Sequence, residues 1–521
     1  MLQETEELGR IKAFGQMAVK VCIIGSGLGG LTCGVILAKN GFEVTVLEQG
    51  AQAGGCLQCF TRHGARFETG MHFIGSAAEG QTMHRIMRYL EMTDDVILSQ
   101  LDPSGYDVVS LGGQQYRYAN GREPFIEQMA SYFPSQKDNL MRYFDAVQSV
   151  ARASSLTSMR HAESNTAVNT KYMVSSTDSV ISQLISDPLL ASVLAGTLPL
   201  YAAERGKTPF ATHAFVMDFY NQSSFRIVGG SDSIARSLVR TIERYGGQVL
   251  TRQKAVKIVC DDTHATGVET DKEQFFAADY VISDAHPMRT LELVDSKLIR
   301  PAFRSRIKAI PQTVGVFSVY LEFKEDSVPY MNHNLYAYNT GTPWGCERYD
   351  EESWPKGFLY MHFCSPLTPT PHLSPLTPRF ATTGVILSYM QWGDVEQWAG
   401  TTVGHRGQDY EDFKQRKAQQ LIASLERHFP GISGKIKHYY TSTPLTYRDY
   451  TGTERGSMYG CAKDIGMGAA GRVPHRTKIP NLLLAGQNIN SHGMQGVIVG
   501  TIVTCSELLT AEHIYRQIMD T

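Results

Sequence analysis

Residues 19–50 read VKVCIIGSGLGGLTCGVILAKNGFEVTVLEQG, and this stretch decides the fold of the 521-residue chain. It opens with a short, mostly apolar run rich in β-branched residues, which is typical of a strand buried on both faces. Gly25, Gly27 and Gly30 follow in the spacing G-x-G-x-x-G. The first glycine permits a tight turn, the second lets the backbone approach a pyrophosphate, and the third lets helix and strand pack closely. The stretch therefore predicts a dinucleotide site.

A second strand, residues 43–47, ends at Glu48, which is 18 residues beyond Gly30. A carboxylate at this place is expected to accept hydrogen bonds from an adenosine ribose. The helix after the loop would direct its N-terminal N–H groups at the phosphates. A glycine-rich helix start without a ligand is the alternative. The expected contacts here are Gly25, Ser26, Gly27, Leu28, Gly29, Gly30, Glu48 and Gln49.

The position of Gly54 and Gly55 indicates which dinucleotide the chain binds. An NAD-type unit would continue with its next crossover, whereas this chain enters a glycine-rich loop, GGCLQCFTRHGARFETGMHFIG. This arrangement resembles flavoproteins with two dinucleotide-binding motifs, in which Gly54 and Gly55 would lie near the FAD ribose and pyrophosphate. A single fingerprint in the chain also favours one tightly held FAD over a separate nicotinamide domain.

Composition restricts the class of protein. Hydrophobic residues make up 42% of the chain, charged residues make up 19%, and the net charge is −2. These values predict a large core in at least two domains and give no sign of nucleic-acid binding. The odd count of nine cysteines favours a reducing compartment over a disulfide scaffold.

The sequence also indicates in which cellular compartment the protein is expected. Residues 1–16 lack the apolar core of a signal peptide and are expected to form a leader. The sequence contains no uninterrupted run of 18 apolar residues, which a membrane-spanning helix would need. We therefore expect a cytoplasmic protein, and peripheral contact with a membrane surface is left open. Residues 179–202 are either two helices of a buried cap or a membrane-facing entrance for a lipophilic substrate.

The middle of the chain has a discontinuous pattern. Residues 81–224 look mainly helical and amphipathic. Gly229 and Gly230 then open a helix that Gly246 and Gly247 close, and short strands follow at 248–253, 255–261 and 264–270. Strands are also expected at 314–323 and 381–392. The aromatic, proline-rich stretch 330–378 could line an elongated apolar pocket or form surface loops and sheet.

The C-terminal segment, IPNLLLAGQNINSHGMQGVIVGTIVTCSELL, carries the second strong signal. We expect a strand at 481–485, a loop at 491–496, and a helix from Val497 onward. The loop and helix N-terminus could stabilise negative charge on a reduced flavin, whereas a plain strand–helix connection would not need four glycines between 486 and 500. The expected contacts are Gly486, Gln487, Gln495, Gly496 and Val497.

These motifs together resemble those of the carotenoid desaturase/isomerase and retinol saturase family of FAD-dependent oxidoreductases. The similarity covers nearly the whole chain. FETGMHFIG and LTYRDYTGTERGSMYG are closer to the all-trans-retinol 13,14-reductase branch. The resemblance implies an α/β fold in which a Rossmann-type FAD-binding domain is joined to a discontinuous α+β substrate domain. The resemblance also implies the domain boundaries. The FAD-binding domain would consist of residues 17–80, 225–299 and 440–521, and the substrate domain of residues 81–224 and 300–439. The backbone of Val256 would contact the adenine.

The same resemblance implies a lipophilic, polyene-like substrate and hydride transfer at flavin N5 that saturates, desaturates or isomerises C=C bonds. The electron donor or acceptor is not identified. A flavin amine oxidase of the same fold is an alternative, although AGQNINSHGMQG has no cysteine for a covalent flavin link. A non-catalytic, prenyl-binding escort relative is another, although it would not need the C-terminal glycine loop.

Candidate catalytic residues are few, because a flavin itself carries the hydride. His72 could exchange a proton near the flavin or could be a packed histidine, and Glu68 could act similarly or form a structural hydrogen bond. Cys56 and Cys59 form a C-x-x-C pair, which we interpret as packed thiols or, alternatively, a redox dithiol. The pair lacks a second C-x-x-C, so no metal site is expected.

Overall fold

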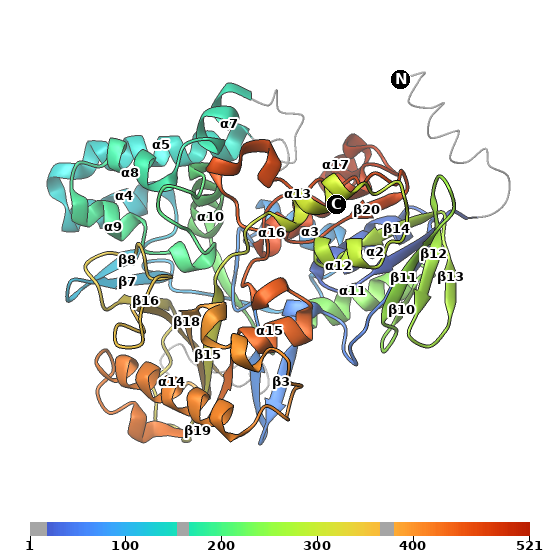
Figure 1. The fold of residues 1–521 in the computed structure, drawn as a ribbon. Coiled ribbons are helices and arrows are strands. Elements are labelled where there is room, and N and C mark those ends of the chain that lie inside the picture. The colour runs from blue at the N-terminus through green and yellow to red at the C-terminus, as the bar shows by residue number, and fades with distance from the viewer. Residues whose placement is uncertain (1–17, 154–165, 365–379) are drawn as a thin grey trace.

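The computed structural model describes residues 18–153, 166–364 and 380–521. The expected leader, residues 1–16, lies outside these ranges, as does part of the aromatic, proline-rich stretch. Two large sheets organise the molecule, and Figure 1 shows them side by side, with a group of helices above the larger one.

The first sheet is parallel throughout and has the order β10-β2-β1-β14-β20. Four segments that are distant in sequence therefore meet in one layer, as the doubly wound pattern requires. Its strands are β1 (Lys20–Ile24), β2 (Glu43–Leu47), β10 (Gln248–Leu250), β14 (Tyr280–Ser283) and β20 (Leu482–Leu484).

Both faces of this parallel sheet are covered, because alternate side chains of each strand point to opposite faces. Val21 and Ile23 pack in one apolar cluster with three helices, whereas Cys22 and Ile24 pack in another with an antiparallel sheet. The helices are α2 (Leu28–Lys39), α11 (Asp232–Arg244) and α16 (Gly493–Cys505); the antiparallel strands are β11 (Ala255–Cys260), β12 (Ala265–Thr270) and β13 (Phe275–Ala277).

The second sheet has seven strands in the order β19-β15-β18-β17-β16-β7-β8. Its two faces also carry separate cores: Tyr336 and Tyr338 pack toward the helical cap, whereas Leu335 and Ala337 pack toward α14 (Gln408–Glu426). The strands are β7 (Asp107–Leu111), β8 (Gln114–Tyr118), β15 (Gly315–Phe323), β16 (Asn334–Tyr338), β17 (Gly357–Phe363), β18 (Thr383–Met390) and β19 (Ile436–Ser442).

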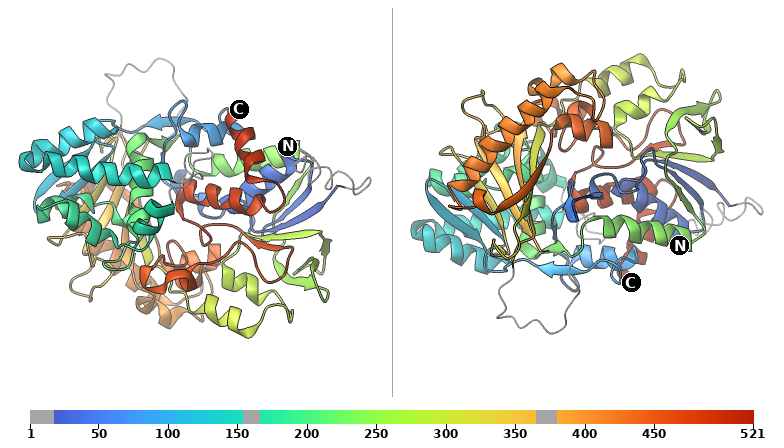
Figure 2. Two further views of the ribbon diagram at one scale, coloured as in Figure 1. Left: turned by 90° about the horizontal axis from the view of Figure 1, so that it is seen from above. Right: turned by 90° about the horizontal axis from the view of Figure 1, so that it is seen from below.

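The helical cap lies at the opposite end of the molecule from strands β11–β13 (Figures 1 and 2). Residues 179–202 belong to it and contain two helices, with Leu190 and Leu194 fully buried. The cap consists of α4 (Arg122–Tyr132), α5 (Lys137–Ala153), α7 (Thr166–Met173), α8 (Thr177–Leu184), α9 (Pro188–Leu194) and α10 (Phe210–Gln222).

Short elements connect these layers. These include the β3–β4 hairpin and a three-stranded sheet ordered β5-β9-β6. These elements are β3 (Cys59–Arg62), β4 (Ala65–Glu68), β5 (Ile74–Gly75), β6 (Leu98–Gln100), β9 (Ser224–Ile227), α3 (Thr82–Tyr89), α12 (Pro287–Glu292), α13 (Pro301–Lys308), α15 (Pro444–Thr451) and α17 (Ala511–Asp520).

Two local expectations from the sequence need correction. Residues 81–224 are mainly helical, but they also contain β6, β7 and β8, which are too short to interrupt the helical pattern. The C-terminal helix begins at Gly493 and not at Val497, because Gly493 and Gly496 are tolerated in its first turn. None of the helices in the described ranges is long and apolar enough to cross a membrane.

Candidate cofactor site and active site

The predicted dinucleotide motifs meet at the carboxyl edge of the parallel sheet. The glycine loop follows β1, Glu48 follows β2, and Gly486 follows β20. In parallel α/β sheets this edge is where ligands bind, because the loops and helix N-termini converge there. The structure therefore brings together residues that are more than four hundred positions apart in the sequence.

The backbones in this region approach so closely that only glycine fits. A Cβ atom on Gly29 would lie 2.8 Å from the Gly486 backbone nitrogen, and one on Gly30 would overlap the Gly25 carbonyl oxygen. A Cβ atom on Gly55 would lie 3.2 Å from the Gly27 Cα atom. These contacts define a glycine cradle, by which we mean residues 25–30, Gly54, Gly55 and Gly486.

Two helices begin in this part of the fold. The N-cap residues of α2 and α16 offer no side-chain cap, although the Gly30 N–H in the first turn of α2 bonds to the Asp284 carboxylate. Free N–H groups and the helix dipole together favour an anionic ligand. Gln495, Gly496 and Val497, which the sequence placed in or just after a loop, lie in the first turn of α16.

Hydrogen bonds hold the acidic end of β2 in place. Glu48 accepts bonds from the backbone N–H (3.1 Å) and hydroxyl (2.5 Å) of Ser26, and from the Gly50 N–H (2.6 Å). The Gly54 N–H donates to the Ser26 carbonyl oxygen at 2.9 Å, which joins the second glycine pair to the first loop. Glu48 is thus fixed beside the cradle, as a ribose-binding carboxylate should be.

The remaining predicted contacts are more dispersed. Gln49 is exposed and Gln487 is half-buried. Val256 lies in β11 and is 45% exposed, next to an irregularity in the register of β11 and β12. Its contact with adenine stays a prediction.

Asp284 is the cradle residue that the sequence analysis missed. It directly follows β14, so it lies on the same sheet edge as the glycine loop and Gly486. A Cβ atom on Gly27 would lie 2.5 Å from its Oδ2 atom. Burial raises the pKa of this carboxyl from 3.8 to about 7, and the negative charge of Glu48 acts in the same direction. The pattern that could have identified Asp284 in the sequence is an acidic residue directly after the apolar run YVIS, as Glu48 follows the second strand.

Glu68 and His72 form a buried pair at the end of the β4 strand. His72 Nδ1 lies 3.3 Å from Glu68 Oε2, and both side chains are 6% exposed. Their other polar atoms, His72 Nε2 and Glu68 Oε1, have no hydrogen-bond partner among the residues that the structure describes. Buried polar atoms are nearly always partnered, so this pair can exchange hydrogen bonds with a bound molecule.

The C-x-x-C cysteines, Cys56 and Cys59, are unlinked in this structure. All nine cysteines of the chain are free thiols, with no disulfide between Cys56 and Cys59. Burial raises the pKa of each of these two thiols from 9.0 to about 11. Both stay protonated at neutral pH and are therefore poor nucleophiles, which supports the packed-thiol interpretation. The described ranges hold no group of three or more His, Cys, Asp or Glu placed to bind a metal ion.

A cavity of about 750 Å³ opens beside the cradle, with Gly55 and Cys56 in its wall. This chamber lies between the β3–β4 hairpin, β19, α14 and α15, and its volume is in the range of small-molecule sites. The Tyr447 hydroxyl donates to the Thr69 carbonyl oxygen at 2.9 Å, which fixes one wall against the loop that leads to His72. Its aromatic lining is Phe60, Tyr320, Tyr410, Tyr439, Tyr440, Tyr447 and Tyr450.

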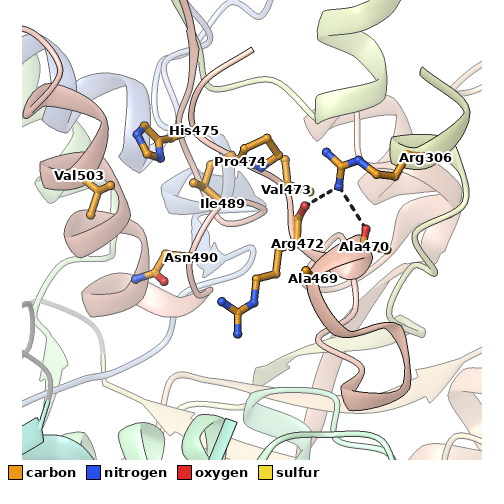
Figure 3. A pocket seen from close by; sticks show the side chains of 10 residues that line it. All are labelled: Arg306, Ala469, Ala470, Arg472, Val473, Pro474, His475, Ile489, Asn490 and Val503. Atoms are coloured by element: carbon orange, nitrogen blue, oxygen red, sulfur yellow. Dashed lines mark hydrogen bonds between the residues drawn. The ribbon is translucent and has the colours of Figure 1, made fainter. Parts of the chain in front are cut away.

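A second pocket, of about 680 Å³, lies beside the loop between β20 and α16 (Figure 3). Arg306 on α13 donates to the carbonyl oxygens of Ala470 (3.2 Å) and Arg472 (2.9 Å). His475 in its wall is paired with Glu507 at 2.6 Å. These bonds anchor the segment that leads into β20.

Comparisons with known proteins agree with this site. A family model described as "Flavin containing amine oxidoreductase" matches residues 28–505. The fold and the glycine cradle thus define a dinucleotide-binding flavoprotein, and the chain belongs to the flavin containing amine oxidoreductase family.

Individual relatives are more specific. All-trans-retinol 13,14-reductase of Rattus norvegicus is 28% identical, covering 95% of this chain and 86% of the rat protein. Prolycopene isomerase 1, chloroplastic, of an Oncidium hybrid cultivar is 24% identical, covering 94% and 83%. The crystal structure of an oxidoreductase from Methanosarcina mazei has a TM-score of 0.61 at 16% identity, covering 94% of this chain and all of that one, and shows the shared fold.

These findings confirm the resemblance, the fold class and the cofactor drawn from the sequence. The chain is an FAD-dependent oxidoreductase whose fold joins a Rossmann-type FAD-binding unit to a discontinuous α+β substrate unit. The residues present fit FAD, because the glycine cradle and the helix N-termini suit a diphosphate and Glu48 suits a ribose.

The cradle can be tested with two alanine variants of one helix. The methyl group of Gly30→Ala would overlap a backbone carbonyl, whereas that of Gly34→Ala would meet only the flexible end of Ile242, at 2.6 Å. We expect G30A to bind FAD at least about tenfold more weakly, or about 1.4 kcal/mol, and G34A to keep its flavin. The ratio of flavin to protein absorbance after purification measures this, and a full flavin content in G30A would contradict the cradle.

Proposed function

We propose that the chain is an FAD-dependent oxidoreductase that acts on C=C or C–C bonds of a lipophilic polyene, such as a retinoid or carotenoid. The observation that carries this proposal is the aromatic chamber beside the cradle, whose tyrosine and phenylalanine faces suit a flat, conjugated chain. The names of the rat reductase and the plant isomerase support the same substrate class.

The bound FAD supplies the hydride chemistry, at its N5 atom. The chain itself must hold the substrate, keep water out and deliver a proton. The chamber walls hold the polyene through apolar and aromatic contact. Glu68 holds the imidazole of His72 through Nδ1, so the unpartnered Nε2 atom is free to face a reacting carbon. In this proposal His72 exchanges the proton and Glu68 orients it.

The decisive experiment is anaerobic. The flavin is reduced, all-trans-retinol or a carotenoid is added, and flavin reoxidation and product mass are followed. We expect that adding a polyene changes the redox state of the flavin or yields a product that can be separated from the polyene. Reoxidation with a gain of two hydrogens identifies a saturase, and unchanged mass with altered chromatography identifies an isomerase. Oxidised flavin that becomes reduced by a polyene identifies a desaturase. If no polyene reacts in either flavin state, the substrate class is wrong although FAD remains.

The role of His72 can be separated from folding. We expect His72→Gln to lower turnover about 10²-fold or more, because the proton donor is lost, with flavin content unchanged. Glu68→Gln should have a smaller effect, since the imidazole remains. His264→Gln is the matched control, because His264 is exposed on the turn between β11 and β12 and does not line the chamber. Turnover of H72Q within about twofold of the original enzyme would show that His72 only packs.

An amine substrate is the second candidate, since the family takes its name from amine oxidation. The charged residues that line the chamber are Arg62, Arg406, Lys414 and Glu411, so cations outnumber acids. Arg406 is paired with Asp449 and Lys414 with Glu411, which leaves positive charge at Arg62 and no acid free for an ammonium group. Primary amines therefore serve as negative controls in the anaerobic assay.

We infer that the polyene enters from a membrane surface at the chamber mouth. Val403 and Tyr450 line the chamber and are 49% and 60% exposed, which is unusual for apolar and aromatic side chains at one opening. The double variant V403S/Y450S should sediment less with phosphatidylcholine–phosphatidylserine vesicles. Val228→Ser, which alters another exposed valine outside the chamber lining, is the control. Equal sedimentation of both variants would place the contact elsewhere.

A further inference from the structure

Asp284 lies inside the glycine cradle that must receive the cofactor's diphosphate. Its two carboxyl oxygens are wrapped by three glycines: a Cβ atom on Gly27 would meet Oδ2, and one on either Gly29 or Gly486 would meet Oδ1. The residue as a whole is nevertheless only partly buried. The carboxyl group thus belongs to the same surface as the N–H groups at the start of α2.

No cation neutralises this carboxyl in the described parts of the chain, where Asp284 takes part in no ion pair. From β2 it faces Glu48, which is also acidic. From α2 and η1 (Gly55–Leu57) it faces the thiols of Cys33 and Cys56. The pKa of Cys33 is raised by a hydrogen bond to Cys505 and by burial, and burial raises that of Cys56 to about 11, so both thiols are neutral.

The other neighbours of Asp284 do not supply positive charge either. His286, on the same segment, has a pKa lowered by burial and is hydrogen-bonded to Gln312 at 3.1 Å. The Gly30 N–H bonds to the carboxylate and favours ionisation, but burial and Glu48 oppose it and the pKa of Asp284 rises to about 7. The carboxyl therefore changes charge within the physiological range of pH.

We propose that Asp284 makes FAD binding proton-dependent: its protonated carboxyl accepts the diphosphate into the cradle, and its ionised form repels it. The protonated acid can donate a hydrogen bond to a phosphate oxygen, whereas the carboxylate is an acceptor only. A carboxylate beside a dianionic diphosphate adds like-charge repulsion in a region of low dielectric. The proposal rests on the cofactor and is independent of the polyene substrate.

The direction of the effect follows from the charge states. Below about pH 7 the carboxyl is protonated, and affinity for FAD is at its highest. Above this pH the free protein loses the proton, and binding must restore it. Each further pH unit then weakens binding by up to about tenfold, until the cofactor-bound form also ionises.

The test uses the flavin-free protein and measures FAD binding by fluorescence between about pH 6 and about pH 8.5. For the unmodified chain we expect at least about a tenfold loss of affinity across this range. Asp284→Asn keeps the shape and a donor but cannot ionise, so its affinity should be independent of pH. Asp279→Asn is the matched control, because it removes an exposed carboxylate at the opposite end of β14 and should keep the pH dependence.

A calorimetric measurement guards against a variant that fails to fold. FAD is titrated into the unmodified flavin-free protein at about pH 8 in two buffers of different ionisation enthalpy. We expect uptake of a large fraction of one proton per FAD bound. Zero proton uptake, a flat pH profile, or an unchanged pH profile in D284N would each overturn the proposal. None of these outcomes bears on which substrate is oxidised or reduced.

Discussion

The contact between the backbones of Gly29 and Gly486 constrains everything else in this molecule. A side-chain atom at Gly29 would come within 2.8 Å of the Gly486 nitrogen, so the first loop and the C-terminal loop can meet only as glycine on glycine. That meeting places the start of α2 and the start of α16 at one edge of the parallel sheet. The diphosphate and the reduced flavin both gain from this arrangement, because both carry negative charge.

The same edge also collects acidic groups, which has a physical cost. Glu48 is held by three hydrogen bonds from neighbouring backbone and hydroxyl groups and can serve a neutral ribose. Asp284 accepts a hydrogen bond from the Gly30 N–H, which does not offset its burial and the charge of Glu48, and its carboxyl lies against Gly27, Gly29 and Gly486 of the cradle. A carboxylic acid in this position is tolerable only when it is protonated, which couples cofactor binding to pH.

The substrate side is built on different physics. The seven-stranded sheet separates two apolar cores, and its β15 and β19 strands give Tyr320, Tyr439 and Tyr440 to the chamber wall. A conjugated hydrocarbon chain is held and oriented by flat apolar and aromatic side chains more than by charged side chains. The unpartnered atoms of Glu68 and His72 are the exception; Glu68 ends β4, and His72 lies on the loop between β4 and β5.

Four strands of the parallel sheet, β1, β2, β10 and β20, could be identified from sequence because each is short, largely apolar and followed or preceded closely by glycine, and the same holds for β15 and β18. The fifth, β14, was not predicted, because it is only four residues long and lies between Asp279 and Asp284 without a glycine. The start of α16 could not, because two glycines in its first turn have low helix propensity and look like a loop. Strands β6–β8 were missed because pairing with β9 and β16 stabilises them and their own pattern is weak. His72 was a candidate because it was expected to lie near the flavin, but its burial together with Glu68 was visible only in the structure.

The sequence by itself determined the cofactor class, because a glycine loop with its strand, helix and acid must satisfy local geometry that few other residues allow. It also determined the family, because the motifs at the two ends of the chain are specific. Tertiary structure decided which distant residues share the cradle. Asp284 enters it only because β14 lies between β1 and β20 in the sheet, and no local pattern encodes that order. The chamber likewise exists only where the hairpin, β19, α14 and α15 meet.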